Sequence, residues 1–222
     1  MGILNKRISW MGLAVCCLMS LLVFTSCSET DEEQEEYVYV ERTLNDSTVY
    51  DWKTGNDKAF EDTLKYAKQQ IANGDTSWKV ILNWSFDHQQ ANGSGTTLSY
   101  GNDRYIVMHM LEEGKGTTNP AYSDSVYVNY RGRLLPSRTY KNGYVFDQSY
   151  KGQLDSRYSS PSEFKVSALV DGFTTALMNM HEGDRCMVYI PYYLAYGSNS
   201  TTSIPAYSML RFDIHLARIV KK

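Results

Sequence analysis

The stretch from Ile190 to Phe212 constrains the fold of this chain most strongly. It reads IPYYLAYGSNSTTSIPAYSMLRF, which is a strand end, a loop with Tyr196 and Gly197, a polar run, an Ile204-Pro205 step and a closing strand. Loops that a rigid sheet holds in place carry a disproportionate share of binding sites. Aromatic residues gathered in such a loop therefore indicate the wall of an apolar pocket.

The segment that closes this stretch has the pattern of a half-buried strand. From Leu210 to Ile219 apolar and polar side chains alternate, which predicts one buried face and one solvated face. A single helix is expected from Gly172 to Met180, ending at Gly183. Further strands are expected at residues 105–111, 125–135, 144–146, 164–166 and 185–190. A half-buried antiparallel sheet with one helix across it is an α+β domain, here residues 100–222.

Residues 37–99 form an ordered extension in front of this domain. A helix is expected from Asn56 to Ala72, with Asn56 or Asp57 as its N-cap and Asn73-Gly74 as its stop. Its apolar stripe consists of Phe60, Leu64, Ala67 and Ile71.

The rest of the extension contains strand and turn signals. Alternating apolar residues predict a strand from Trp78 to Phe86, which includes Trp84. A further short strand is expected at residues 37–40, and residues 92–95, NGSG, are expected to form a turn or a flexible loop. The extension has too little apolar content for a core of its own, so we expect it to pack on the following domain or to dimerise.

The first 27 residues are expected to leave the chain before it folds. Lys6 and Arg7 precede an uncharged apolar run from Met11 to Phe24, and small residues then lead to Cys27. This order is typical of a secretory signal, and the run is short for a membrane span of ~20 residues. The end of the segment resembles a bacterial lipobox, which would make Cys27 the acylated first residue of a lipoprotein, carrying palmitate or a similar chain. A plain signal peptide with an incidental cysteine is the alternative.

Residues 28–36, SETDEEQEE, are interpreted as an acidic tether. They also resemble the acidic signals that send some lipoproteins to the outer surface of the cell. The sequence does not separate these two interpretations.

Charge and cysteine content exclude several classes of function. Without Lys6 and Arg7 the chain has 20 basic residues against 25 acidic ones, so it lacks the basic patch that nucleic-acid binding needs. With Cys27 acylated, Cys186 is the one thiol left in the mature chain, and its inward position in an expected strand predicts an inert, buried side chain. The histidines, at positions 88, 109, 181 and 215, lack ligand spacing. We therefore expect neither a metal nor a cofactor.

A set of short motifs resembles the FKBP family of peptidyl-prolyl isomerases in both content and order. The motifs are VYVNYRG (126–132), YVFD (144–147), FKV (164–166), LVDGF (169–173), LMNMHEG (177–183), IP (190–191), AYG (195–197), IP (204–205) and LRF (210–212). The resemblance covers residues 100–222. It implies an α+β fold with an FKBP-like antiparallel sheet wrapped on one short helix, preceded by the helix-plus-strand extension.

The resemblance also implies a pocket for the proline of a peptide. By this resemblance the catalytic residues are Tyr196, Asp147 and Phe173, and the substrate-binding residues are Tyr130, Phe146, Leu169, Val170, Ile204 and Phe212. Core packing is the alternative role for the apolar members of this set.

The sequence departs from the family pattern in three places. Phe173 stands where the pocket floor is usually tryptophan, and Ser162 stands where an aromatic residue is common. Insertions flank Phe146-Asp147, and Arg157 in the second of them is a candidate partner for Asp147. These departures affect the expected catalytic strength more than the expected fold.

The resulting functional hypothesis is a prolyl isomerase of the cell envelope that assists the folding of exported proteins. Its partners would be proline-containing polypeptides and, through the N-terminal lipid, the outer membrane on its periplasmic side or at the cell surface. The sequence leaves open whether the chain forms a homodimer. One alternative is a catalytically weak FKBP-like lipoprotein that binds a peptide or another ligand, and another is an interaction lipoprotein with a vestigial pocket.

Overall fold

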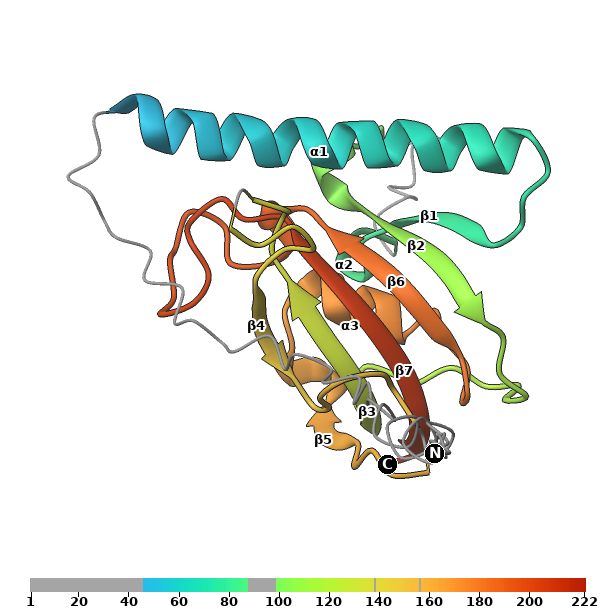
Figure 1. The fold of residues 1–222 in the computed structure, drawn as a ribbon. Coiled ribbons are helices and arrows are strands. Elements are labelled where there is room, and N and C mark those ends of the chain that lie inside the picture. The colour runs from blue at the N-terminus through green and yellow to red at the C-terminus, as the bar shows by residue number, and fades with distance from the viewer. Residues whose placement is uncertain (1–45, 88–98, 138, 156) are drawn as a thin grey trace, which may run out of the picture. The chain divides into compact units, whose positions relative to one another are not determined.

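The computed structural model describes residues 46–87, 99–137, 139–155 and 157–222 (Figure 1). The signal segment with Cys27, the acidic tether, the strand expected at residues 37–40 and the turn expected at residues 92–95 lie outside this part of the chain. None of the described helices is both long enough and apolar enough to cross a membrane.

Strands and helices alternate irregularly along the chain. The strands are β1 (Trp78–Leu82), β2 (Tyr105–Glu112), β3 (Ser125–Arg133), β4 (Val145–Gln148), β5 (Ser162–Lys165), β6 (Arg185–Ile190) and β7 (Leu210–Val220). The α-helices are α1 (Asp46–Ala72), α2 (Trp84–Asp87) and α3 (Asp171–Leu177), and short 3-10 helices are η1 (Asn102–Arg104), η2 (Val166–Ala168) and η3 (Tyr192–Leu194).

These strands form one seven-stranded antiparallel sheet. Its order is β1-β2-β6-β7-β3-β4, and β5 also pairs with β3. The last strand, β7, lies in the middle of the sheet between β6 and β3. Its predicted alternation is confirmed, since Leu210, Phe212, Ile214 and Leu216 are all buried. The α+β architecture predicted from the sequence is therefore confirmed.

The short helix α3 covers one face of the sheet and builds the larger core. Its residues from Gly172 to Leu177 are all buried, and Leu177 packs in one apolar cluster with side chains of β2, β3, β6 and β7. The side chain of Cys186 belongs to this cluster and is fully buried, which confirms the burial predicted from the sequence.

The long helix α1 covers the opposite face. Phe60, Leu64 and Ala67 of α1 pack with Val107 of β2 and with Met209. Val107 faces α1 while its neighbours Ile106 and Met108 in β2 belong to the core on the α3 face. This is the side-chain alternation of a strand that is covered on both faces. The prediction that the extension packs on the following domain is confirmed, and β1 also pairs with β2 along its whole length.

The helix of the extension differs from its prediction at both ends of its stripe. It begins at Asp46, so Asn56 lies inside the helix and is not its N-cap. Ile71, predicted to face the core, is 42% exposed, so this part of the prediction is wrong. The predicted stop is confirmed, since Gly74 has a φ of +87°, which glycine adopts without strain.

The strand predicted from Trp78 to Phe86 ends at Leu82, and this part of the prediction is wrong. Trp84 and Phe86 lie in the helical turn α2, where their rings stack on Tyr122 and contact Tyr100. The backbone N–H of Asn83 donates to the Arg104 carbonyl and the N–H of Phe86 donates to the Asn83 carbonyl. These two bonds turn the chain out of the sheet in spite of its alternating sequence.

Candidate active site

Four aromatic rings from four different elements meet at one part of the α3 face. Phe173 of α3 and Phe212 of β7 have ring centroids 4.9 Å apart with an interplanar angle of 84°. Phe146 of β4 meets Phe212 at 5.4 Å and 89°, and Tyr130 of β3 meets Phe173 at 6.3 Å and 88°. Edge-to-face contacts of this kind are the preferred arrangement of aromatic pairs. The rings therefore form one aromatic cluster.

Gly132 of β3 allows two of these rings to lie over the backbone. It pairs with Asp147 of β4 and Phe212 of β7. A Cβ atom added to Gly132 would lie 2.5 Å from Phe146 Cζ and 2.6 Å from Phe212 Cε1. The motifs alone did not predict this role of Gly132, although a glycine inside a strand often marks a close backbone approach.

The polar element of the cluster is a hydrogen bond between a tyrosine and a carboxylate. Tyr130 Oη donates to Asp147 Oδ2 at 2.8 Å. Burial, first of all, and then this hydrogen bond and the charge of Asp147 raise the pKa of the Tyr130 phenol well above its usual range. Tyr130 therefore stays neutral as a donor and holds the exposed carboxylate of Asp147 at the edge of the rings.

Arg157, the candidate partner for Asp147, is engaged elsewhere. Its Nη2 lies 2.7 Å from Asp155 Oδ2 and its Nε donates to Asp155 Oδ1 at 3.0 Å. Asp155 is only two residues away, so this pair forms within the insertion itself. The partner that the structure gives to Asp147 is Tyr130.

The loop between β6 and β7 brings Tyr196 and Ile204 to the cluster. Tyr196 is 39% exposed, and its electrostatic interaction with Tyr130 is the smallest of the causes that raise the pKa of the Tyr130 phenol. Ile204 is buried and packs in the core of the α3 face. Its backbone forms a closed turn with Thr201, whose N–H donates to the Ile204 carbonyl and whose Oγ1 accepts from the Ile204 N–H.

Leu169 and Val170 complete the set at the start of α3. Both are partly buried against the core of the α3 face, and the Val170 carbonyl accepts the first hydrogen bonds of α3 from Phe173 and Thr174. All nine residues implied by the resemblance thus belong to the α3 face or to its edge. The seven apolar and aromatic members other than Tyr196 belong to or contact the core, whereas Asp147 and Tyr196 are exposed.

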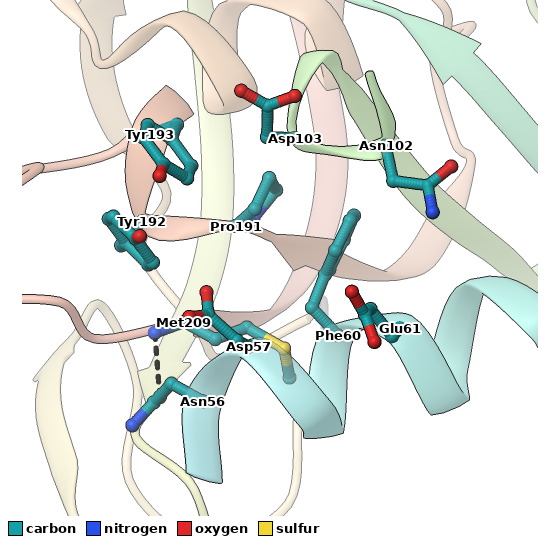
Figure 2. Close-up of a pocket in the computed structure, with 10 residues that line it drawn as sticks. All are labelled: Asn56, Asp57, Phe60, Glu61, Asn102, Asp103, Pro191, Tyr192, Tyr193 and Met209. Atoms are coloured by element: carbon teal, nitrogen blue, oxygen red, sulfur yellow. Dashed lines mark hydrogen bonds between the residues drawn. The ribbon is translucent and has the colours of Figure 1, made fainter. Parts of the chain in front are cut away.

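A separate cavity of about 510 Å³ lies between α1 and the segment that follows β6 (Figure 2). The residues that line it are Asn56, Asp57, Phe60, Glu61, Asn102, Asp103, Pro191, Tyr192, Tyr193 and Met209. None of the nine residues implied for the proline pocket is among them. Two of its side chains are paired at its rim, since Lys53 bonds Asp57 at 2.6 Å and Arg104 lies 3.3 Å from Asp103.

Fold and site together define a class of α+β domain in which a single antiparallel sheet and one short helix hold aromatic rings and a carboxylate at a common edge. Residues 116–217 match the sequence model of the FKBP-type peptidyl-prolyl cis-trans isomerases and belong to that family. The resemblance predicted from the motifs is confirmed at this level.

Curated relatives extend this match. The macrophage infectivity potentiator of Trypanosoma cruzi is 37% identical over 115 residues, which cover 51% of this chain and 53% of that protein. The FKBP-type peptidyl-prolyl cis-trans isomerase FkpA of Escherichia coli K12 is 30% identical over 160 residues, which cover 72% of this chain and 53% of that protein. The outer membrane protein MIP of Legionella longbeachae is 34% identical over 113 residues, or 50% and 43%. The chain spans about half the length of these relatives.

Proposed function

We propose that this protein catalyses the cis-trans isomerisation of peptide bonds that precede proline. The observation that carries the proposal is the aromatic cluster of Tyr130, Phe146, Phe173 and Phe212, with Asp147 bonded to Tyr130 at its edge. The family match of residues 116–217 supports the same activity. Tyr196, Asp147 and Phe173 are the residues proposed to act on the reacting bond.

The proposed chemistry needs the removal of water and the positioning of the peptide. Rotation about the bond has a barrier of about 18–20 kcal/mol because amide resonance keeps the bond planar. The planar amide is charge-separated, so an apolar aromatic wall that excludes water destabilises it more than the twisted form. A differential effect of about 7 kcal/mol would accelerate rotation about 10⁵-fold.

The side chains at the edge are proposed to hold the substrate. The exposed phenol of Tyr196 donates a hydrogen bond to a substrate carbonyl, and Ile204 packs against the pyrrolidine ring. Asp147 accepts from Tyr130, which leaves the Tyr130 ring fixed against Phe173. Phe173 forms a smaller floor than the family's usual tryptophan and lacks an indole N–H. This is the feature that favours the alternative, a catalytically weak domain that binds peptide or another ligand.

A protease-coupled assay with a proline-containing peptide at low temperature tests the activity. Wild-type protein is expected to isomerise the peptide above the uncatalysed rate, and Tyr196→Phe and Asp147→Ala are each expected to lower kcat/KM. Arg157→Ala is a matched control, because Arg157 bonds Asp155 and not the cluster. Tight binding of a rapamycin-type ligand without turnover would contradict the isomerase and support the alternative, a domain that binds a ligand without useful catalysis. Absence of both would leave a vestigial pocket.

We further propose that the protein acts in the cell envelope on exported polypeptides, held to the outer membrane by a lipid on Cys27. The motif order of residues 1–27 supports this, as does the similarity to a relative that is named an outer membrane protein. Cell fractionation of wild type and Cys27→Ser is the test. Wild type should sediment with membranes and the variant should not, and equal distribution of the two would contradict the anchor.

A further inference from the structure

Two asparagines of the extension are buried and bonded to elements that carry the proline pocket. Asn56 in α1 and Asn83 after β1 are each only 1% exposed. Both precede residue 116, where the family match begins. A buried side-chain amide is costly unless its polar atoms are hydrogen-bonded, so the partners of these two amides show what they hold.

Asn56 fixes the segment that leads from the site loop into β7. Its Oδ1 accepts from the backbone N–H of Met209 at 2.8 Å, and its Nδ2 donates to the Trp52 carbonyl at 2.8 Å. The first of these bonds is visible in Figure 2, where Asn56 reaches from α1 to the backbone of Met209. It joins residues 153 positions apart in the chain.

A second hydrogen-bonded path runs from α1 to the residue next to Ile204. Trp52 Nε1 donates to Ser208 Oγ at 3.3 Å, and Ser208 Oγ donates to the Pro205 carbonyl at 2.6 Å. Between these positions Tyr207 has a φ of +60°. A residue other than glycine keeps such a conformation only where its surroundings hold it; here the Tyr207 ring contacts Tyr192, and Lys53 of α1 lies 5.9 Å from its centroid.

The same segment is bonded to the backbone beside Tyr196. The N–H of Tyr207 donates to the Gly197 carbonyl at 2.9 Å, and the N–H of Gly197 donates to the Tyr192 carbonyl at 2.8 Å. The bonds from α1 therefore reach both pocket residues of the loop, Ile204 on one side and Tyr196 on the other.

Asn83 makes the corresponding link to the pocket floor. Its Oδ1 lies 2.8 Å from Thr175 Oγ1, whose one hydroxyl hydrogen has a second acceptor in the Asp171 carbonyl at 2.7 Å, and Thr175 Oγ1 accepts from the Trp84 N–H at 3.2 Å. Thr175 is fully buried in α3, two residues after Phe173. The extension thus makes separate polar contacts to α3, which carries Phe173, and to the segment that follows the loop with Tyr196 and Ile204.

We infer that the extension is a positioning element of the proline pocket, in which Asn56 sets the loop with Tyr196 and Ile204 and Asn83 sets α3 with Phe173. This inference rests on the proposed isomerase function. Neither asparagine touches the substrate; each acts through the backbone or helix that it holds. A small displacement of groups that position a substrate lowers rate strongly.

The test compares Asn56→Ala with Leu64→Ala in the full chain. Leu64 lies on the same helix and is 2% exposed; it belongs to the apolar cluster that includes Val107 and Met209, but its side chain makes no hydrogen bond to the segment that Asn56 holds. At a temperature where circular dichroism shows both variants folded, Asn56→Ala is expected to lower kcat/KM about 10-fold, chiefly through kcat, and Leu64→Ala to change it less than about twofold. Asn83→Ala is the second variant, expected to act like Asn56→Ala and to serve in its place if that variant does not fold.

A measurement that does not depend on activity completes the test. The backbone amide resonances of Ile204 and Gly197 are expected to shift or broaden in Asn56→Ala and to stay at their wild-type positions in Leu64→Ala. An active wild type with unchanged kcat/KM in both asparagine variants overturns the inference and leaves the isomerase intact. An inactive wild type overturns the isomerase, and the amide resonances alone then decide whether Asn56 positions the loop.

Discussion

The two faces of the sheet are covered by helices of very different length and are used in different ways. The 27-residue α1 lies over one face with a stripe of aliphatic and aromatic side chains, and most of its other side chains from Trp52 onward are exposed to solvent. The 7-residue α3 is buried along almost its entire length, and its face carries the aromatic cluster with two exposed polar residues at the edge. The proposed proline pocket lies on the face with the short helix, and we infer that the long helix positions elements of that pocket.

This difference shows how a long accessory helix can influence a site on the other face of a sheet. The apolar packing of Leu64 and Ala67 stays on the α1 face. The polar contacts of Asn56 and Trp52 reach Met209 and Ser208 at the end of the sheet, where the site loop enters β7. Stability and positioning therefore depend on different residues of one helix.

The largest expected effect is a loss of stability when a leucine is truncated in the core on either face of the sheet. Leu177→Ala on the α3 face and Leu64→Ala on the α1 face are each expected to lower the free energy of unfolding by about 2–5 kcal/mol, because both side chains are fully or almost fully buried. Only Leu177→Ala is expected to lower kcat/KM as well, since Leu177 lies in the helix that carries Phe173. Urea unfolding and the isomerase assay check the pair. An equal loss of activity in both variants would break the contrast between the faces.

A pair of glycines gives the next effect, and its two members have opposite signs. Gly132→Ala would force a methyl group against Phe146 and Phe212, so it is expected to lower the free energy of unfolding by about 1–3 kcal/mol and kcat/KM at least about 10-fold. Gly55→Ala in α1 meets no atom within 4 Å and is expected to raise stability by about 0.5–1 kcal/mol. Thermal unfolding of both variants measures this. A destabilising Gly55→Ala would contradict the open surface assigned to that position.

A further expected effect is a pH dependence that begins on the α3 face. Burial, with a smaller contribution from Asp184 and Asp213 against Lys79, raises the pKa of the Cys186 thiol from 9.0 to about 12. The unfolded thiol ionises first, so stability from this group is complete below pH 9 and is lost as the pH rises towards 12. At pH 10 the loss is about 1.4 kcal/mol.

Cys186→Ala is expected to lack this loss when urea unfolding is compared at pH 8 and pH 10. The matched variant is Tyr189→Phe, because Tyr189 packs on the α1 face and burial raises the pKa of its phenol from 10.0. Its contribution begins about one pH unit higher, so Tyr189→Phe should keep most of the loss up to pH 10. Identical curves for wild type and Cys186→Ala would show that the thiol is not held neutral.

Local periodicity accounts for what the sequence predicted well. The alternation of β7 and the bounds of β6 were predictable because every second side chain of these strands is buried. The stripe of α1 through Ala67 was predictable from helical spacing. The motifs also indicated which residues gather on the α3 face. The roles assigned to them remain proposals for the assays above.

Features set by contacts between distant residues were not predictable in the same way. Asn56 is of a residue type that is common at helix N-caps. In the structure it lies within α1, and its side chain accepts a hydrogen bond from the Met209 N–H. Trp84 alternates like a strand residue but lies in α2, where its backbone N–H donates to Thr175 Oγ1 and the Asn83 N–H donates to the Arg104 carbonyl. Arg157 pairs with Asp155 because an insertion can satisfy its own charges. In each case a partner that local sequence does not reveal decides the conformation.

The central place of β7 has a consequence for how this chain reaches its native state. Because β7 comes last in the sequence and lies between β6 and β3, the sheet remains two separate halves, β1-β2-β6 and β3-β4-β5, until residues 210–220 insert. During that interval the inner edges of both halves present unpaired backbone groups that can join with other chains. The long sequence separation of the β3–β7 pairing makes this closing step slow. A nascent copy is therefore most vulnerable to aggregation until its final strand is in place.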